Sequence, residues 1–145
     1  MQKVNYRDIT RFSFHYWGQH KMLGLLAVAA LVTSVAIDIF IPLLTGKIVD
    51  ALSQSPPGDP IALDKALGYF WGFVAAAFGH YFFWLIAFKM WNAFAVRNLH
   101  TLLGDALSTV QRFSAEWHAN SFAGATVRKI TRGMWSFDVF EDTLF

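Results

Sequence analysis

The 145-residue sequence contains no cysteine, only four prolines and few charged side chains. Without cysteine the chain cannot form disulfides, a CxxC redox motif or a zinc site built on thiolates. Charged residues make up only 15% of the chain and hydrophobic residues 55%. An average soluble domain has roughly 25% charged residues. The formal net charge of +2, without a basic run interleaved with aromatic residues, does not predict a nucleic-acid partner.

The apolar residues are concentrated in two blocks of 23 residues each, 22–44 and 66–88. That length crosses a bilayer core of about 30 Å with some tilt. The sequence therefore predicts an all-α membrane protein with two transmembrane helices, and a soluble helical bundle is disfavoured. Residues 45–65 are expected to form an external loop, because their run of Pro56, Pro57, Gly58 and Pro60 is typical of a turn.

The N-terminal segment, residues 1–21, is basic and aromatic. Ile9, Phe12 and Tyr16 recur at helical spacing, which predicts an amphipathic helix in the membrane interface that contacts lipid. The alternative is a frayed polar terminus. Of the Lys and Arg residues, four lie in 1–21, two in 45–65 and six after residue 88. The positive-inside rule therefore predicts an integral membrane protein with both termini in the cytoplasm.

A second periodic pattern follows the second apolar block. Residues 66–117 contain no proline, and as one helix they would be roughly 78 Å long. Within 89–117, apolar residues recur every three or four positions, which predicts a packed cytoplasmic extension. The positions are Val96, Leu99, Leu103, Ala106, Val110, Phe113 and Trp117.

The periodicity stops at residues 117–123, which are rich in turn residues. Residues 124–145 are expected to form a returning helix and the start of a third transmembrane segment. The repeating positions there are Val127, Ile130, Met134, Phe137, Glu141 and Leu144, of which only Glu141 is polar. This pattern continues to residue 145 without a helix stop signal, so the chain is expected to be a fragment.

Catalytic and metal-binding motifs are not found in the sequence. Thr45-Gly46-Lys47 lacks the remaining residues of a phosphate loop, and the five histidines lack metal-ligand spacing. We therefore expect no enzyme activity and no bound cofactor or metal in this chain alone. Asp38 and His80 are ionisable residues inside the apolar blocks and are candidates for a substrate path, with a purely structural role as the alternative. Counted from the inner ends of their blocks, they differ in depth by about 12 Å, so a direct pair is not expected.

Two stretches and the order of the segments carry a family resemblance. Residues 41–52 read IPLLTGKIVDAL, and residues 113–131 read FSAEWHANSFAGATVRKIT. Together with an interfacial segment, two spans, a long extension and a returning helix, they resemble the start of the transmembrane domain of ATP-binding cassette (ABC) exporters of the lipid and multidrug type.

The resemblance implies a first coupling helix that contacts a nucleotide-binding domain. Its residues would be Trp117, His118, Ala119, Asn120, Ser121 and Phe122. ATP and Mg²⁺ would bind to that separate domain, and two transporter halves would assemble as a homo- or heterodimer. The intact protein would export a substrate across the bacterial inner membrane at the expense of ATP. The alternative function is a complete two-span membrane protein whose cytoplasmic helical hairpin acts as an interaction or scaffold module.

Overall fold

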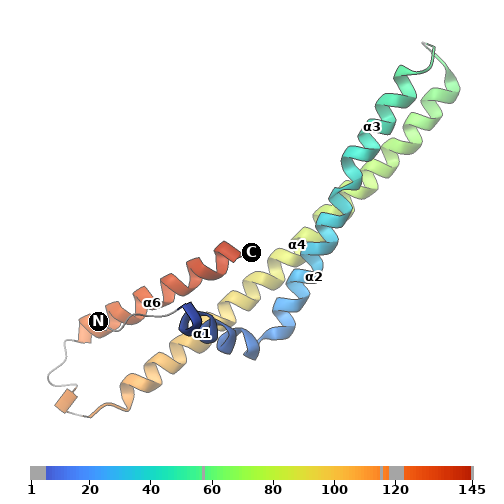
Figure 1. Ribbon diagram of the computed structural model, residues 1–145. Helices are drawn as coiled ribbons and strands as arrows, with labels where there is room; N and C mark the ends of the chain where they lie inside the picture. The colour runs from blue at the N-terminus through green and yellow to red at the C-terminus, as the bar shows by residue number, and fades with distance from the viewer. Residues whose placement is uncertain (1–5, 57, 115, 118–122, 145) are drawn as a thin grey trace. The chain divides into compact units, whose positions relative to one another are not determined.

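A computed structural model describes residues 6–56, 58–114, 116–117 and 123–144. The helices are α1 (Tyr6–Gln19), α2 (Lys21–Asp38), α3 (Phe40–Ser53), α4 (Pro60–Gln111) and α6 (Ala123–Leu144) (Figure 1). Because these described residues include no strand, the predicted all-α class is confirmed. The chain divides into two compact units. The hairpin unit is Leu25–Met90, and the terminal unit combines Met1–Gly24 with Trp91–Phe145.

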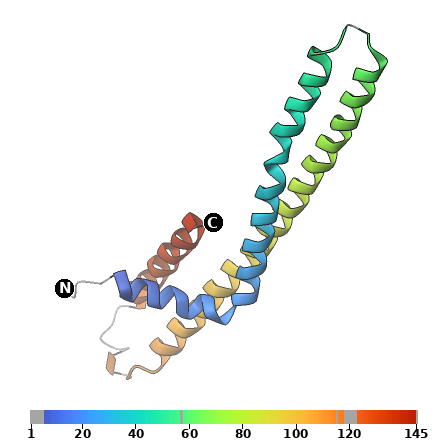
Figure 2. The same cartoon turned by 45° about the vertical axis from the view of Figure 1, so that its right-hand side comes forward.

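In the hairpin unit, α2 and α3 run antiparallel to the first part of α4, as both views show (Figures 1 and 2). A Cβ added at Gly79 would lie 3.6 Å from Ile37, and one at Gly72 would lie 3.5 Å from Leu44. In each of these two pairs the residue numbers add up to 116, so the helices keep the same antiparallel register at both contacts.

Small side chains are buried in the hairpin unit and large ones are exposed. The buried residues are Ala27, Ala30, Ser34, Ala62, Ala66 and Ala87. In contrast, Trp71, Phe78 and Phe82 are each more than half exposed. A soluble protein shows the reverse distribution, whereas membrane helices pack through small residues and turn large apolar ones outward. Two helical segments, Lys21–Ser53 and Pro60–Gln111, are long and apolar enough to cross a membrane.

The connection between the two long segments is shorter than the predicted loop of residues 45–65. α3 continues to Ser53 and α4 begins at Pro60, so the sequence boundaries are corrected at both ends. Proline is well tolerated at the first position of a helix, where its missing N–H is not needed. The Asp59 carboxylate caps this helix by accepting the N–H of Ile61 at 3.0 Å. Pro60 therefore starts a helix here and does not end one.

The first membrane segment is interrupted at Ile39, between α2 and α3. Pro42 lies four residues after Asp38 and has no N–H to donate to the Asp38 carbonyl, so the regular helical bond is lost at this point. The backbone of Ile39 nevertheless keeps right-handed helical angles (φ −60°, ψ −28°). The chain therefore changes helix without reversing direction.

In the terminal unit, α1 and α6 pack against the last part of α4. Phe12, Tyr16 and Phe137 form an edge-to-face cluster with ring centroids 5.0 to 6.1 Å apart. Trp17 stacks on Phe140 with its centroid 6.1 Å away. The predicted N-terminal and returning helices both exist, and part of the aromatic face of α1 is covered by protein.

The packed face of α4 in the terminal unit differs from the predicted apolar seam. Val96, the first residue of that seam, is 59% exposed, whereas Phe94 and Asn98 are buried. Contacts to α1, to the adjacent His20 and to α6 come from Phe94, Asn98, Thr101 and Asp105, which repeat at spacings of four, three and four. Three of these four residues are polar, so counting apolar positions shifted the seam onto a neighbouring face.

Candidate functional site

His80 of α4 and Ser34 of α2 are joined inside the hairpin unit. The Ser34 hydroxyl donates to the His80 carbonyl oxygen at 3.0 Å, and its Oγ lies 3.1 Å from His80 Nδ1. His80 Nδ1 also lies 3.2 Å from the Ser34 carbonyl oxygen. Ser34 is 1% exposed, so these contacts tie the two helices together in a buried position. Sequence analysis missed Ser34, although a small polar residue within an apolar block is typical of a helix contact.

Asp38 completes this group, because its Oδ1 lies 4.0 Å from His80 Nδ1. The expectation that Asp38 and His80 do not pair directly is therefore wrong. With the observed register, Asp38 lies level with residue 78, so the two side chains differ by two residues, or about 3 Å, along the helix axis. The expected difference in depth of about 12 Å assumed that residues 22 and 88 lie at the same level. Instead, Gly24 lies opposite Phe94, because a Cβ added at Gly24 would be 3.2 Å from the Phe94 ring.

The arrangement of Ser34, His80 and Asp38 is not a nucleophilic triad. In such a triad the serine and the carboxylate contact different nitrogens of the imidazole. Here Ser34 Oγ and Asp38 Oδ1 both lie on the Nδ1 side, and the Ser34 hydrogen is donated to a backbone carbonyl. The exposed fractions of the His80 and Asp38 side chains are 34% and 59%. These two side chains can therefore contact a polar group of a ligand, whereas Ser34 holds His80 in place.

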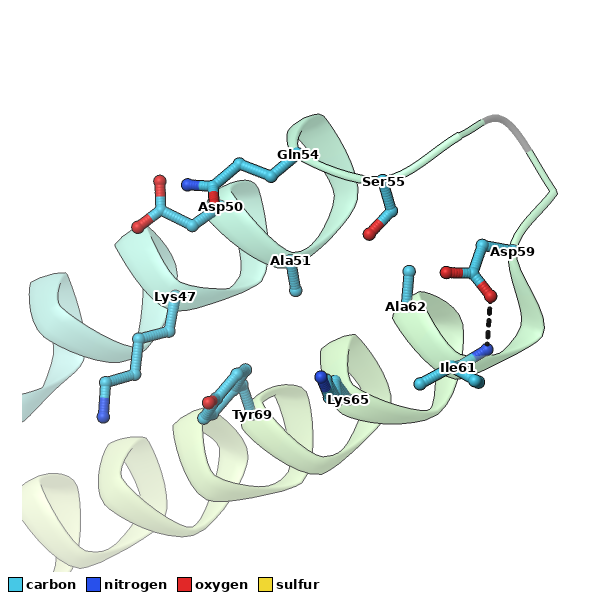
Figure 3. Close-up of a pocket in the computed structure, with 10 residues that line it drawn as sticks. All are labelled: Lys47, Asp50, Ala51, Gln54, Ser55, Asp59, Ile61, Ala62, Lys65 and Tyr69. Atoms are coloured by element: carbon cyan, nitrogen blue, oxygen red, sulfur yellow. Dashed lines mark hydrogen bonds between the residues drawn. The ribbon is translucent and has the colours of Figure 1, made fainter.

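The turn between α3 and α4 carries an open pocket of about 350 Å³ (Figure 3). Two lysines and two aspartates line it: Lys47, Asp50, Asp59 and Lys65. The Lys47 ammonium lies 5.4 Å from the centre of the Tyr69 ring, which is a cation–π distance. The four formal charges cancel, so this pocket does not select an ion of one sign.

A polar network links the three helices of the terminal unit. The Tyr16 hydroxyl donates to Asp105 Oδ2 at 3.2 Å. Glu141 Oε1 accepts the Trp17 indole N–H at 2.6 Å and the Asn98 amide N–H at 2.7 Å. Burial raises the pKa of Tyr16, and its bond to Asp105 raises it further. Sequence analysis treated Glu141 as the one polar exception in its pattern and did not identify Asn98 or Asp105.

The pKa of the Glu141 carboxyl is also raised, with burial as the largest cause. The bonds from Asn98 and Trp17 act in the opposite direction, and the nearby carboxylates of Asp138 and Asp142 raise the pKa further. A buried carboxyl without a cationic partner favours its neutral form.

The predicted coupling residues lie between α4 and α6. Of these, Trp117 is described: its backbone N–H donates to Ser114 Oγ at 3.2 Å, and its ring centroid lies 4.5 Å from that of Phe113. The other predicted positions, residues 118–122, lie outside the described residues. Within the described ranges, no group of three or more His, Cys, Asp or Glu side chains could hold a metal ion.

Comparison with known families matches residues 24–140 to a family model described as ABC transporter transmembrane region. The match includes the whole hairpin unit and extends through most of α6. No curated protein and no solved structure matches the chain. The family suggested by residues 41–52 and 113–131 is confirmed, and the lipid and multidrug type stays a prediction.

Proposed function

The chain belongs to the ABC transporter transmembrane region family, and on this premise we propose that it forms part of the membrane domain of an ATP-driven exporter. As a transporter component it contributes membrane helices. In this proposal ATP and Mg²⁺ bind to a nucleotide-binding domain outside residues 1–145, and this chain holds neither. A second transporter half supplies the remaining helices around the substrate.

The observation that carries this proposal is the extent of α4, an uninterrupted helix of 52 residues. The helix is about 78 Å long, whereas the bilayer core is about 30 Å thick. Its apolar block ends near residue 88, and 23 further residues follow before the helix ends at Gln111. Those residues correspond to about 35 Å of helix beyond the apolar block, enough to reach a domain outside the lipid.

We propose that Trp117, His118, Ala119, Asn120, Ser121 and Phe122 contact the nucleotide-binding domain. This segment follows the end of α4 and precedes α6, so movement of the attached domain would act directly on two helices. A rigid helix can transmit such a movement because packed elements shift as bodies and deform little. Family membership supports this assignment.

We propose that His80 and Asp38 contribute to the substrate path. Ionisable side chains are costly within a membrane and usually serve a function there. Both are partly exposed in the hairpin unit, and two contacts from Ser34 to His80 Nδ1 fix the orientation of the imidazole ring. The pair can present a donor and an acceptor to a polar group of the substrate.

We further propose a bacterial inner-membrane location with both termini in the cytoplasm. Two membrane segments place the ends of the chain on the same side, and the excess of Lys and Arg outside residues 45–65 favours the cytoplasm for that side. The exposed large apolar side chains of the hairpin unit then face lipid or helices of the second half.

The proposed transport role is tested by cross-linking in native membranes. The chain has no cysteine, so a single Glu116→Cys variant gives one defined attachment point beside the coupling segment. We expect a thiol-to-amine cross-linker to join it to a polypeptide with a GxxxxGK[ST] loop and ATPase activity. Gln54→Cys, in the turn between α3 and the start of α4, is the matched control and should not give this product. Equal cross-linking of both variants, or no ATPase in the product, would contradict the proposal and favour the scaffold role.

The substrate path is tested by His80→Ala in the assembled transporter. We expect this variant to lower ATP-dependent export more than it lowers the amount of protein inserted in the membrane. His100→Ala is the control, because His100 is an exposed histidine on the same helix. If insertion and export fall together in His80→Ala, His80 has a structural role only.

A further inference from the structure

The carboxyl group of Glu141 is buried with one oxygen satisfied and the other not. Glu141 and Asn98 are both 0% exposed. Oε1 of Glu141 accepts two hydrogen bonds, one from α1 through Trp17 and one from α4 through Asn98. In contrast, Glu141 Oε2 and Asn98 Oδ1 are buried and have no hydrogen-bond partner among the described residues. Both atoms are acceptors, so neither can satisfy the other while Glu141 is ionised.

A protonated carboxyl and a side-chain amide can form two complementary hydrogen bonds. In one bond the amide N–H donates to a carboxyl oxygen, and in the other the carboxyl O–H donates to the amide oxygen. The first of these is present between Asn98 and Glu141 at 2.7 Å. The two unsatisfied oxygens are the remaining atoms of the same two groups. A single proton on Oε2 would supply the missing donor, because a neutral carboxyl carries an O–H.

We propose that Glu141 is a proton-binding site, and that the bound proton holds α1, α4 and α6 together in a clamp that loosens as the pH rises. The clamp is defined by Trp17, Asn98 and Glu141, one residue from each helix. It depends only on contacts within the terminal unit, so it can be tested without a transport assay.

The titratable groups around the clamp favour proton binding. On α6, Asp138 and Asp142 raise the pKa of Glu141, in addition to the larger effect of burial. On α4, the carboxylate of Asp105 is bonded to Tyr16 of α1, and the Arg97 side chain beside Asn98 is exposed. His20, between α1 and α2, lies 3.4 Å from Thr101 Oγ1. No Lys or Arg among the described residues forms an ion pair with Glu141.

The direction of the pH effect follows from the raised pKa. The clamp is fully formed at pH values below the ordinary pKa of a glutamate, where Glu141 carries its proton whether or not the helices are packed. As the pH rises through the raised pKa, the proton leaves and an unpaired charge remains among buried side chains. The packed arrangement is then disfavoured, and we expect α1 to separate from α6.

Infrared spectroscopy tests the proton itself. Purified chain in lipid nanodiscs at neutral pH should show the carbonyl stretch of a protonated carboxyl, and Glu141→Gln should remove this band. Glu116→Gln is the control, because it makes the same substitution at an exposed glutamate and leaves Glu141 and its neighbours unchanged. If the wild-type chain lacks the band, or if it persists in Glu141→Gln, the proton-binding site is refuted. If Glu141 is instead an ionised carboxylate hydrogen-bonded to a water molecule, the wild-type chain will lack the band.

Distance measurements test the clamp. Spin labels at Thr10→Cys on α1 and Ser136→Cys on α6 occupy exposed positions in a chain without other cysteines. We expect one short distance in mildly acidic buffer and an added longer population in mildly alkaline buffer. The upper limit is about pH 9, where Tyr16 keeps its proton. Glu141→Gln should abolish the longer population, because the glutamine amide stays neutral and can donate to Asn98 Oδ1.

A second variant serves if Glu141→Gln does not fold. Asp142→Asn removes one of the negative charges that raise the pKa of Glu141, so the midpoint of the distance change should move to lower pH. An unchanged midpoint, or a shift to higher pH, would show that the change does not report on Glu141. A distance independent of pH in the wild-type chain would overturn the clamp directly.

Discussion

The Tyr16 hydroxyl donates a hydrogen bond of 3.2 Å to Asp105, which lies 89 positions further along the chain. This bond links α1 to α4. Tyr16 is 7% exposed, and its ring contacts the rings of both Phe12 and Phe137. One side chain therefore contributes both an aromatic contact to α6 and a polar contact to α4. The effects of these two contacts can be separated by substitution.

Tyr16→Phe keeps the aromatic ring and removes the hydroxyl. We expect a loss of about 0.5–1.5 kcal/mol in the free energy of unfolding, the usual contribution of one hydrogen bond. Chemical unfolding in detergent, followed by circular dichroism, measures this change. Tyr6→Phe is the matched control, because Tyr6 is 86% exposed, and it should change little. Equal effects of the two variants would show that the Asp105 bond does not stabilise the protein.

The same bond predicts a step in stability at alkaline pH. The pKa of Tyr16 is raised in the folded protein, first by burial and then by Asp105. Its contribution is therefore fully present below the ordinary tyrosine pKa of about 10 and is lost as the pH rises through the raised value. Stability measured against pH should fall less steeply in this range for Tyr16→Phe. Parallel curves for the variant and the wild-type chain would argue against this titration.

Ser34→Ala should weaken the contact between α2 and α4. The substitution removes the hydroxyl that donates to the His80 carbonyl, and polar contacts between membrane helices contribute about 0.6 kcal/mol on average. The neighbouring Thr33→Ala is the control, because the Thr33 hydroxyl donates to the Ala29 carbonyl of its own helix and bonds to no other helix among the described residues. Unfolding in mixed detergent micelles measures both variants. A larger loss for Thr33→Ala would contradict the observed pairing.

Gly24→Ala and Gly46→Ala should have opposite effects on stability. A Cβ at Gly24 would lie 3.2 Å from the Phe94 ring, which is 4% exposed and flanked by Trp17 and Trp91. Within the described part of the chain, no side chain lies within 4 Å of a Cβ at Gly46, so alanine there should stabilise the helix by up to about 1 kcal/mol. Thermal unfolding of the two variants provides the comparison. A gain in stability for Gly24→Ala would show that Phe94 can move aside.

Single-cysteine labelling tests the proposed orientation in the membrane. Gln54→Cys, in the turn after α3, should react with a membrane-impermeant maleimide added to intact cells. Ser108→Cys, near the end of α4, should react only after the cells are permeabilised. Both side chains are exposed, so a difference in labelling reports the side of the membrane. The reverse pattern would invert the proposed topology.

The sequence was sufficient to predict the helical class, the two long apolar segments and the family. The apolar blocks are long, and the absence of proline from residues 61–111 leaves α4 uninterrupted. The register of the hairpin could not be predicted, because the apolar side chains that fill both blocks do not indicate which residues are level. For the same reason the Asp38–His80 contact was excluded wrongly.

The polar network of the terminal unit could not be predicted from hydrophobic periodicity. Asn98 is buried and Asp105 bonds to Tyr16, but a search for apolar residues treats both as solvent-facing. Glu141 fell on the predicted repeat only as its one polar member. The partners of these three residues lie 43 to 124 positions away along the chain, so no local pattern links them. The start of α4 at Pro60, within the predicted loop, was missed for a different reason. Proline is compatible both with the end of one helix and with the first turn of the next.

The terminal unit is assembled from the two ends of the chain, with the whole hairpin unit between them. During synthesis, α1 leaves the ribosome long before Asp105 and Glu141 exist to accept the hydrogen bonds of Tyr16 and Trp17. Until the hairpin has been inserted, the aromatic residues of α1 must be shielded by another surface, for which a lipid headgroup layer is chemically suited. Chain connectivity thus imposes an order of synthesis: the whole hairpin unit is made before the N-terminal helix can dock on its partners.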